Sequence, residues 1–337
     1  MTTTEPTGRI LGLPNRWFVL LFIVLGGVFG YAVYPPVLPH VQLPAEALTH
    51  PVTLPVIGEF ALTNTIVATL ISDVILLLIG FGVYRASRRA EATGNLILTG
   101  FSGAMEALLE ALWNLAESTA GKWARRIFPI MATIVLLVLI NNWLELIPGV
   151  DSIGRLEPAE HGTPVQQVLN GVYSIVPAAQ EAAAHGAEEQ FSLMAFVRAA
   201  PTDLNFTVAL ALIAVFMTQV IGVQALGSGY FSKFWNTKTL FSKPMFGAID
   251  FAVGLLEVVS ELSKILSFAF RLFGNIFAGT VLLFVIGTLV PAFAQSIFLL
   301  LEFFVGLIQA IIFGMLTLVF MYLATLGHGD HEEEHHG

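Results

Sequence analysis

The chain has 337 residues, of which 56% are hydrophobic and only 12% are charged, and its formal net charge is −9. Because an average soluble domain is about a quarter charged, this composition excludes a disordered chain and favours a polytopic membrane protein. The absence of cysteine excludes disulfides, thiolate catalysis and Cys-ligated metals, and the acidic balance argues against nucleic-acid binding.

Six segments are apolar enough to cross a bilayer: 17–34, 61–84, 127–147, 204–226, 250–290 and 295–326. A perpendicular span needs about 20 residues, which fits the first four. As helices, the last two would reach roughly 60 Å and 48 Å, against a hydrocarbon thickness of about 30 Å. We therefore predict an all-α polytopic membrane protein whose last two helices form a steeply tilted hairpin, with its turn at Pro291.

Lysine and arginine predict the direction of the spans, because cytoplasmic loops are enriched in them. The outer side receives Arg155 and Arg198, and the fifth segment contains Lys264 and Arg271. Alternating crossings place both chain ends and all the remaining cations in the cytoplasm: Arg9, Arg16, Arg85, Arg88, Arg89, Lys122, Arg125, Arg126, Lys233, Lys238 and Lys243.

The first segment has two interpretations. Arg16 followed by an apolar run is also typical of a signal sequence. However, Tyr34-Pro35-Pro36 follows at once and offers no small-residue cleavage site. We expect an uncleaved anchor within an N-terminal region, 1–60, that precedes a membrane domain at 61–326.

Residues 95–120 are too polar to span a membrane. Leucines recur there at three- and four-residue steps, with Glu106, Glu110 and Glu117 on other faces. This pattern predicts an amphipathic helix at the cytoplasmic interface. A docking surface for a partner protein is the alternative.

Two further polar regions are expected to be solvated. The insertion 148–203 lies on the outer side and includes Ala- and Glu-rich stretches such as Ala178–Gln190. We expect a solvated loop there with one short helix. The tail 327–337 is rich in histidine and glutamate. It could bind a metal, but a solvated cytoplasmic tail is favoured.

The fifth segment contains polar residues that are costly in a bilayer, by about 2.5–3.5 kcal/mol for an ionisable side chain at its centre. At 100° per residue, they fall within an arc of about 80°. One face of this helix is therefore predicted to be polar along its whole length, as expected for an ion pathway. The residues are Asp250, Glu257, Glu261, Lys264, Arg271 and Asn275.

Arg271 lies near the middle of this segment, between Phe270 and Leu272, with no acidic residue within one helical turn. Because arginine stays protonated in proteins, it needs a partner from elsewhere. One interpretation is an ion pair with Glu302 or Glu145 of the same chain. The other is a fixed cation that meets a carboxylate of another subunit.

Other polar residues lie in or beside the spans. Glu302 and Gln309 share one face of the sixth segment, within about 20°. Glu302 is either a neutral, hydrogen-bonded core residue or a group that accepts and releases protons. Asp73, in the second segment, is expected to hydrogen-bond a neighbouring helix. By position alone, polar residues at the outer ends of the third and fourth segments are helix caps or anchors: Asn142, Glu145, Asp203 and Asn205.

At Arg271-Leu272-Phe273-Gly274-Asn275 the sequence strongly resembles subunit a of the rotary F-type ATP synthases. The resemblance covers about residues 60–326 and includes four further motifs. These are the polar run from Glu257 to Lys264; Asn142-Trp143-Leu144-Glu145-Leu146-Ile147-Pro148; Asp203-Leu204-Asn205-Phe206-Thr207; and Gln309 followed by Ala310-Ile311-Ile312-Phe313.

The resemblance implies a stator subunit with two offset half-channels, which carry protons to and from carboxyl groups on a ring of small c subunits. It implies that Arg271 is the essential charge barrier between the half-channels and that Glu302 is a proton relay. The implied outer half-channel comprises Asn142, Glu145, Asp203, Asn275 and Gln309. The implied inner half-channel comprises Asp250, Glu257, Ser260, Glu261 and Lys264.

The resemblance also implies the setting of the chain. Its expected partners are the c-ring, the peripheral-stalk b subunits, the lipid bilayer and, indirectly, the soluble ATPase sector. No cofactor, metal, nucleic acid or catalysis by this chain alone is expected. The expected location is an energy-coupling membrane, the bacterial inner (plasma) membrane, with both termini cytoplasmic.

The sequence departs from the family pattern in two respects. Some members have an acid at the position of Thr280 and a histidine at the position of Glu302. Here the acid is at Glu302, so the relay role passes to it. The N-terminal segment and the loop 148–203 are not general family features.

Two other classes of function compete with this interpretation. A secondary transporter or self-contained channel would use the buried charges to bind its own substrate, but it predicts broken helices or an internal repeat, and neither is evident. A structural scaffold gives no reason to place Arg271 and Glu302 in hydrocarbon.

Overall fold

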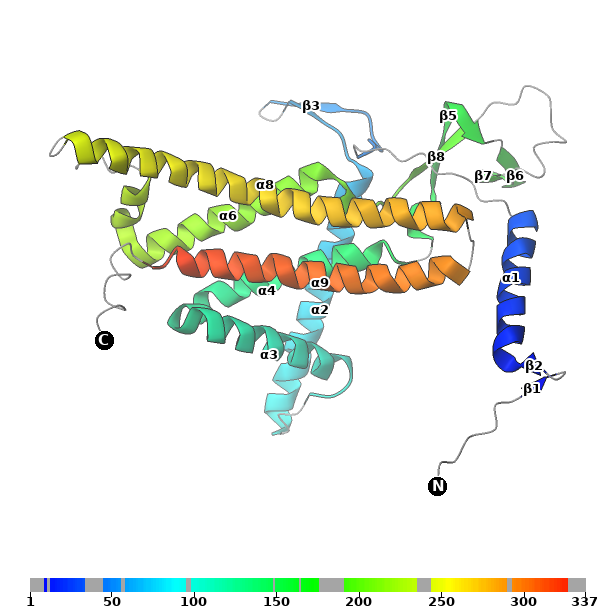
Figure 1. Cartoon of the computed structure of the whole chain (residues 1–337), viewed down its shortest axis with the longest axis horizontal. Coiled ribbons are helices and arrows are strands. Elements are labelled where there is room, and N and C mark those ends of the chain that lie inside the picture. Colours follow the sequence, from blue (N-terminus) through cyan, green and yellow to red (C-terminus); the bar gives the residue numbers. More distant parts are fainter. Residues whose placement is uncertain are drawn as a thin grey trace. The chain divides into compact units, whose positions relative to one another are not determined.

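The computed structural model describes residues 9–10, 13–33, 45–55, 58–94, 98–147, 149–163, 165–175, 191–234, 244–289 and 293–326. Its α-helices are α1 Asn15–Val33, α2 Asn64–Thr93, α3 Phe101–Ala120, α4 Ala124–Leu144, α6 Leu204–Leu226, α8 Pro244–Leu289 and α9 Phe293–Leu323 (Figure 1).

Five helical stretches of the described chain are long and apolar enough to cross a membrane: Asn64–Thr93, Phe101–Leu144, Leu204–Phe231, Phe251–Gly287 and Ala294–Leu323. The predicted all-α polytopic class is confirmed. The first predicted segment, 17–34, corresponds to α1.

The helix ends differ from the predicted spans because hydropathy detects the part of a helix in hydrocarbon, whereas local chemistry sets where the helix stops. α2 continues past the predicted end at 84 to Thr93, where Gly94 adopts a left-handed backbone with φ 69°. α8 starts at Pro244 rather than at 250, since proline suits the first position of a helix. α6 matches the prediction, and the Asp203 side chain caps it by accepting from the N–H of Asn205 at 2.9 Å.

The chain divides into two compact units. The smaller unit comprises Met1–Gln42, Asp151–Phe196 and Ala278–Phe304. The larger unit comprises Leu43–Val150, Val197–Phe277 and Val305–Gly337.

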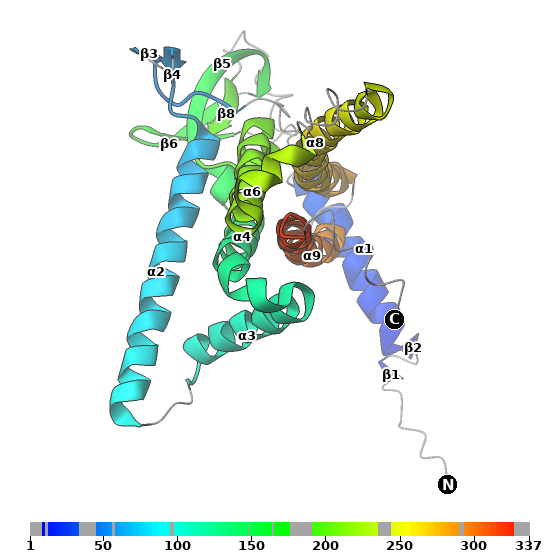
Figure 2. The ribbon, with the colours of Figure 1, turned by 90° about the vertical axis from the view of Figure 1, so that its left-hand side faces the viewer.

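In the larger unit, α2 runs across α4 and α6 rather than alongside them. Figure 1 shows α4 and α6 extending in one direction with α2 standing across them, and Figure 2 shows α2 nearly in the plane of the view. Polar side chains join these helices. The Ser72 hydroxyl donates to Asn141 Oδ1 at 3.1 Å, and the Thr65 hydroxyl donates to Asp203 Oδ2 at 3.0 Å.

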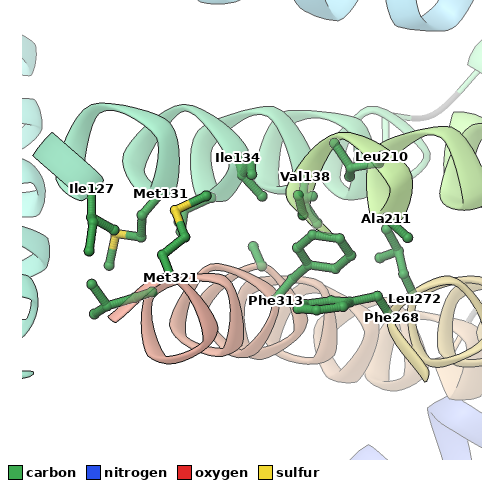
Figure 3. Packing of buried hydrophobic residues seen from close by; sticks show 14 of the residues in the cluster. Ile127, Met131, Ile134, Val138, Leu210, Ala211, Phe268, Leu272, Phe313 and Met321 are labelled. Atoms are coloured by element: carbon green, nitrogen blue, oxygen red, sulfur yellow. The ribbon is translucent and has the colours of Figure 1, made fainter. Parts of the chain in front are cut away.

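The core of the larger unit lies between α4, α6, α8 and α9 (Figure 3). The ring of Phe268 lies 4.7 Å from the ring of Phe313 and 5.6 Å from that of Phe320. A Cβ atom at Gly314 would overlap Val135, so this glycine allows α9 to approach α4 closely. Packing of this kind fixes which faces of α8 and α9 remain exposed.

α3 is the helix predicted from the amphipathic pattern of 95–120. Its Glu106, Glu110 and Glu117 are exposed, whereas Leu112 is buried. The buried face packs on α4, where the rings of Trp113 and Phe128 lie 5.2 Å apart. A short 3₁₀ turn, Gly121–Trp123, joins the two helices. In the larger unit β3 Val52–Leu54 pairs with β4 Gly58–Phe60.

In the smaller unit, the described part of 148–203 forms β-strands where a solvated loop was expected. The described residues of this region contain two antiparallel strand pairs. β5 Gly154–Thr163 pairs with β8 Phe191–Ala195, and β6 Val165–Leu169 pairs with β7 Val172–Ile175. Asn170 and Gly171 connect β6 to β7, with φ 82° at Gly171, and Asn-Gly is the strongest short hairpin signal. A short 3₁₀ turn at Val150–Ser152 precedes these strands, and near the N-terminus of the smaller unit β1 Arg9–Ile10 pairs with β2 Leu13–Pro14. Another 3₁₀ turn, Ala200–Thr202, belongs to the larger unit.

Several expectations lie outside the described residues. They concern the turn at Pro291, the Ala- and Glu-rich stretch Ala178–Gln190, the start of the amphipathic segment at 95–97, Tyr34-Pro35-Pro36, Lys238 and Lys243, and the tail 327–337.

Candidate functional site

The polar face of α8 is divided by burial. Glu261 is buried, with 8% of its surface exposed. Glu257 and Lys264 are half-buried, and Ser260, Arg271 and Asn275 are exposed. Asp250 lies in the first turns of α8, and its side chain is outside the described part of the chain. The polar face predicted from the sequence is therefore buried at Glu261 and exposed at Ser260, Arg271 and Asn275.

Arg271 lies on the exposed part of this polar face. Phe268 and Leu272, on the adjoining face of α8, are buried in the core, so the guanidinium remains on the exposed side of the helix. Its Nη2 donates to the Ser267 hydroxyl at 3.3 Å, one turn earlier. Within the described part of the larger unit no carboxylate forms an ion pair with it, so the alternative of a pair with Glu145 is not met.

Glu261 lies in a polar cluster that joins α6, α8 and the turn that follows α6. Lys264 Nζ donates to its Oε1 at 2.8 Å, and Gln219 Nε2 donates to its Oε2 at 3.0 Å. The Tyr230 hydroxyl donates to Gln219 Oε1 at 2.7 Å. Glu261, Lys264, Gln219 and Tyr230 are called the Glu261 cluster below.

Sequence reasoning missed Gln219 and Tyr230. Tyr230 lies in the 3₁₀ turn Gly227–Lys233 and is 2% exposed. A Cβ atom at Gly222 would overlap its ring, so this glycine makes room for it against α6. The available signal was Gln219 itself, a long polar side chain in the strongly apolar helix α6.

α8 and α9 are joined by a hydrogen bond in which Asn275 Nδ2 donates to Gln309 Oε1 at 2.7 Å. Gln309 is 2% exposed, and its Nε2 has no hydrogen-bond partner among the described residues. Asn142 Nδ2 donates to the carbonyl of Gly306 at 2.9 Å, which joins α4 to α9. Its Oδ1 is likewise buried and unpaired within the described chain. The structure therefore brings both predicted amides against α9, each with one hydrogen-bonding atom available.

Asp203 and Glu145 lie at helix ends, as position alone predicted. Asp203 is 6% exposed and, besides capping α6, accepts the hydrogen bond from Thr65. Glu145 directly follows α4 and is half-buried. The structure thus gives Asp203 an anchoring role between α2 and α6.

The anchoring role of Asp203 can be separated from its charge. Asp203→Ala removes the cap and the hydrogen bond from Thr65, and is expected to destabilise the protein by about 1–2 kcal/mol. Asp203→Asn keeps one oxygen to cap α6, and its amide N–H can donate to the Thr65 hydroxyl in place of the bond that Asp203 accepts, so it is expected to cost less. The melting temperature of the purified protein, followed by its aggregation, measures the difference. Equal melting temperatures for wild type and Asp203→Ala would contradict the anchoring role.

Glu302 lies in the part of α9 that belongs to the smaller unit, and 7% of its surface is exposed. Its carboxyl group is packed against the backbone of α8 at Gly279, where a Cβ atom would overlap the carboxyl carbon and both oxygens. Its Oε1 has no hydrogen-bond partner among the described residues. The space above Gly279, called the Gly279 seat, therefore holds the Glu302 carboxyl group against α8 and leaves its Oε1 available for a hydrogen bond.

The expectation for Asp73 is not met in the described part of the chain. Asp73 is exposed on α2 and has no hydrogen bond there. The neighbouring Ser72 makes the contact with α4 instead, because one residue along a helix turns a side chain by about 100°.

Comparisons with known proteins agree on one family. The family model described as ATP synthase A chain matches residues 66–322, well over half of the chain. ATP synthase subunit a of Moorella thermoacetica is 27% identical over 286 residues, covering 84% of this chain and 100% of the relative. ATP synthase subunit a 1 of Syntrophotalea carbinolica is 27% identical over 249 residues, covering 74% and 80%. Subunit a of Campylobacter jejuni is 29% identical over 236 residues, covering 69% and 80%.

Proposed function

The chain belongs to the ATP synthase A chain family, and from this premise we propose how its residues carry protons across the membrane. A subunit of this family is the proton-translocating stator component of the membrane sector. It works within a multisubunit complex and catalyses no reaction by itself. The energy available is about 2.3 kcal/mol per charge per 100 mV.

Arg271 is the charge barrier. The observation that carries this role is an exposed guanidinium, bonded to Ser267, between the buried Phe268 and Leu272. Such a cation attracts a deprotonated carboxylate of a passing c subunit and repels a proton that would cross directly. A proton therefore has to bind a c subunit, move with the ring and leave on the other side.

Two proton paths, an outer one and an inner one, lead to the level of Arg271. The outer path is lined by Asn142, Glu145, Asp203, Asn275 and Gln309, with Glu302 as relay. The unpaired Asn142 Oδ1 and Gln309 Nε2 support it, because they offer an acceptor and a donor inside the protein. The inner path is lined by Asp250, Glu257, Ser260, Glu261 and Lys264, of which Ser260 is exposed and Glu257 half-buried.

The long helices fit a tilted hairpin against the ring. α8 has 46 residues and α9 has 31, so they are about 69 Å and 46 Å long, well above a hydrocarbon thickness of about 30 Å. Their antiparallel pairing is supported by contacts between Phe268 and Phe313 and between Asn275 and Gln309. We divide the chain into an anchor region at 1–60, a membrane domain at 61–326 and a tail at 327–337.

The proposed setting is the bacterial inner membrane, with both termini in the cytoplasm and with c-ring and peripheral-stalk b subunits as partners. Purification of the tagged chain in mild detergent tests it. We expect a very small two-span proteolipid and a soluble ATPase to copurify, detected by mass spectrometry. If the chain purified alone and still transported ions in vesicles, a self-contained transporter would replace this proposal.

A further inference from the structure

α8 contains two cations, Lys264 and Arg271, seven residues apart. They lie roughly 10 Å apart along the helix axis and within about 20° of the same face. A carboxylate attracted to one would therefore also experience the other. The two cations nevertheless have different partners. Arg271 donates a hydrogen bond to the uncharged Ser267, whereas Lys264 forms an ion pair with Glu261.

The pairing of Lys264 is held firmly. Its Nζ lies 2.8 Å from Glu261 Oε1, and the two side chains are 23% and 11% exposed. The ammonium also lies 5.0 Å from the centre of the Phe320 ring on α9, a favourable cation–π distance. The charge of Lys264 is therefore compensated inside the protein rather than presented at the surface of α8.

Gln219 and Tyr230 keep the carboxylate in place. Gln219 donates to Glu261 Oε2 at 3.0 Å, and the buried Tyr230 hydroxyl donates to Gln219 Oε1 at 2.7 Å. The tyrosine orients the amide of Gln219, which then presents its N–H to the second oxygen of Glu261. Each carboxylate oxygen has a donor, so Glu261 cannot swing away from Lys264 without losing a buried hydrogen bond.

We propose that the Glu261 cluster cancels the charge of Lys264, so that Arg271 is the uncompensated fixed cation that α8 presents. In this role Gln219 and Tyr230 are positioning residues that act through Glu261. The inference rests on the proposed function of Arg271 and deepens it. A second uncompensated cation on the same face would hold the ring carboxylate after it leaves Arg271 and would slow each step of rotation.

A double-mutant cycle in the whole complex tests the charge balance. Glu261→Gln, Lys264→Gln and the double variant are compared in inverted membrane vesicles, with ATP-driven proton uptake normalised to the assembled complex. Glu261→Gln frees the Lys264 charge about 10 Å from Arg271 and is expected to slow uptake about tenfold. The double variant has no charge at either position and is expected to be faster than either single variant.

The supporting residues have matched controls. Gln219→Leu and Tyr230→Phe are expected to slow proton uptake about threefold, because Glu261 loses one fixed hydrogen bond. Gln224 is an exposed glutamine on the same helix and Tyr84 an exposed tyrosine on α2, so Gln224→Leu and Tyr84→Phe are expected to have little effect. If the Glu261 cluster had a purely structural role, its variants would all lose assembled complex to the same extent. The double variant Glu261→Gln, Lys264→Gln would then show no recovery.

Three results would overturn the inference: wild-type uptake in Glu261→Gln, a double variant no faster than Glu261→Gln, or equal effects of Gln219→Leu and Gln224→Leu. Arg271→Ala, measured in parallel, tests the proposed function separately. Full proton-driven ATP synthesis in Arg271→Ala would refute the barrier itself, whereas an inactive Arg271→Ala with a failed cycle would refute only the charge compensation.

Discussion

Replacing Arg271 with alanine is expected to abolish proton-driven ATP synthesis, with a loss of at least about a hundredfold in rate. Two unit charges about 4 Å apart interact by about 4 kcal/mol at an effective dielectric constant of 20, and each 1.4 kcal/mol is a factor of about ten. The guanidinium is exposed on α8 and bonded to the neutral Ser267. Its removal therefore takes away the attraction for a ring carboxylate and the barrier to direct proton passage together.

Two variants control for loss of structure. Arg271→Lys keeps a positive charge on a shorter side chain that lacks the planar fork of arginine, so partial synthesis is expected. Arg125→Ala removes an exposed arginine at the start of α4 and is expected to leave synthesis unchanged. The rates are measured in energised vesicles that contain equal amounts of assembled complex. Full synthesis in Arg271→Ala would contradict the barrier.

The spans could be predicted because a hydrocarbon environment leaves a strong local signal in the sequence. α6 was located at its exact ends, since the apolar run, the Asp203 cap and Gly227 all coincide. α2 was predicted too short because its last residues, after Tyr84, are polar but favour a helix. The hairpin β6–β7 was missed although Asn170-Gly171 is a typical turn, because the acidic composition of the loop outweighed that signal.

The site could be predicted only along single helices. The polar face of α8 follows from helical periodicity, which places Glu261 and Lys264 on one face, where they form an ion pair. Contacts between helices come from elsewhere in the chain: Gln219 is 42 residues before Glu261, and Gly279 is 23 residues before Glu302. No periodic pattern connects such positions. A glycine that makes room for a carboxyl group is recognised only when the facing helix is in place.

Replacing Glu302 with glutamine is expected to slow proton transport about a hundredfold while the subunit still assembles, since removing a proton-transferring group costs about 10² to 10⁴ in rate. The amide has the shape of the carboxyl group and fits the same seat at Gly279, so assembly is retained. It cannot exchange a proton at physiological pH, so the relay is lost. Proton uptake and the amount of assembled complex are measured on the same vesicles.

A substitution at Gly279 provides the decisive comparison, because it changes the position of the Glu302 carboxyl group and leaves the chemistry of that group intact. Gly279→Ala places a methyl group where the Glu302 carboxyl lies and is expected to slow proton transport. Gly287→Ala, two turns further along α8, brings a methyl group 3.3 Å from the flexible Gln295 amide and is expected to have little effect. If Glu302→Gln prevented assembly and Gly279→Ala transported protons normally, Glu302 would be a packing residue. Slow transport in both, with assembly retained, would mean that the carboxyl group has to be both ionisable and correctly placed.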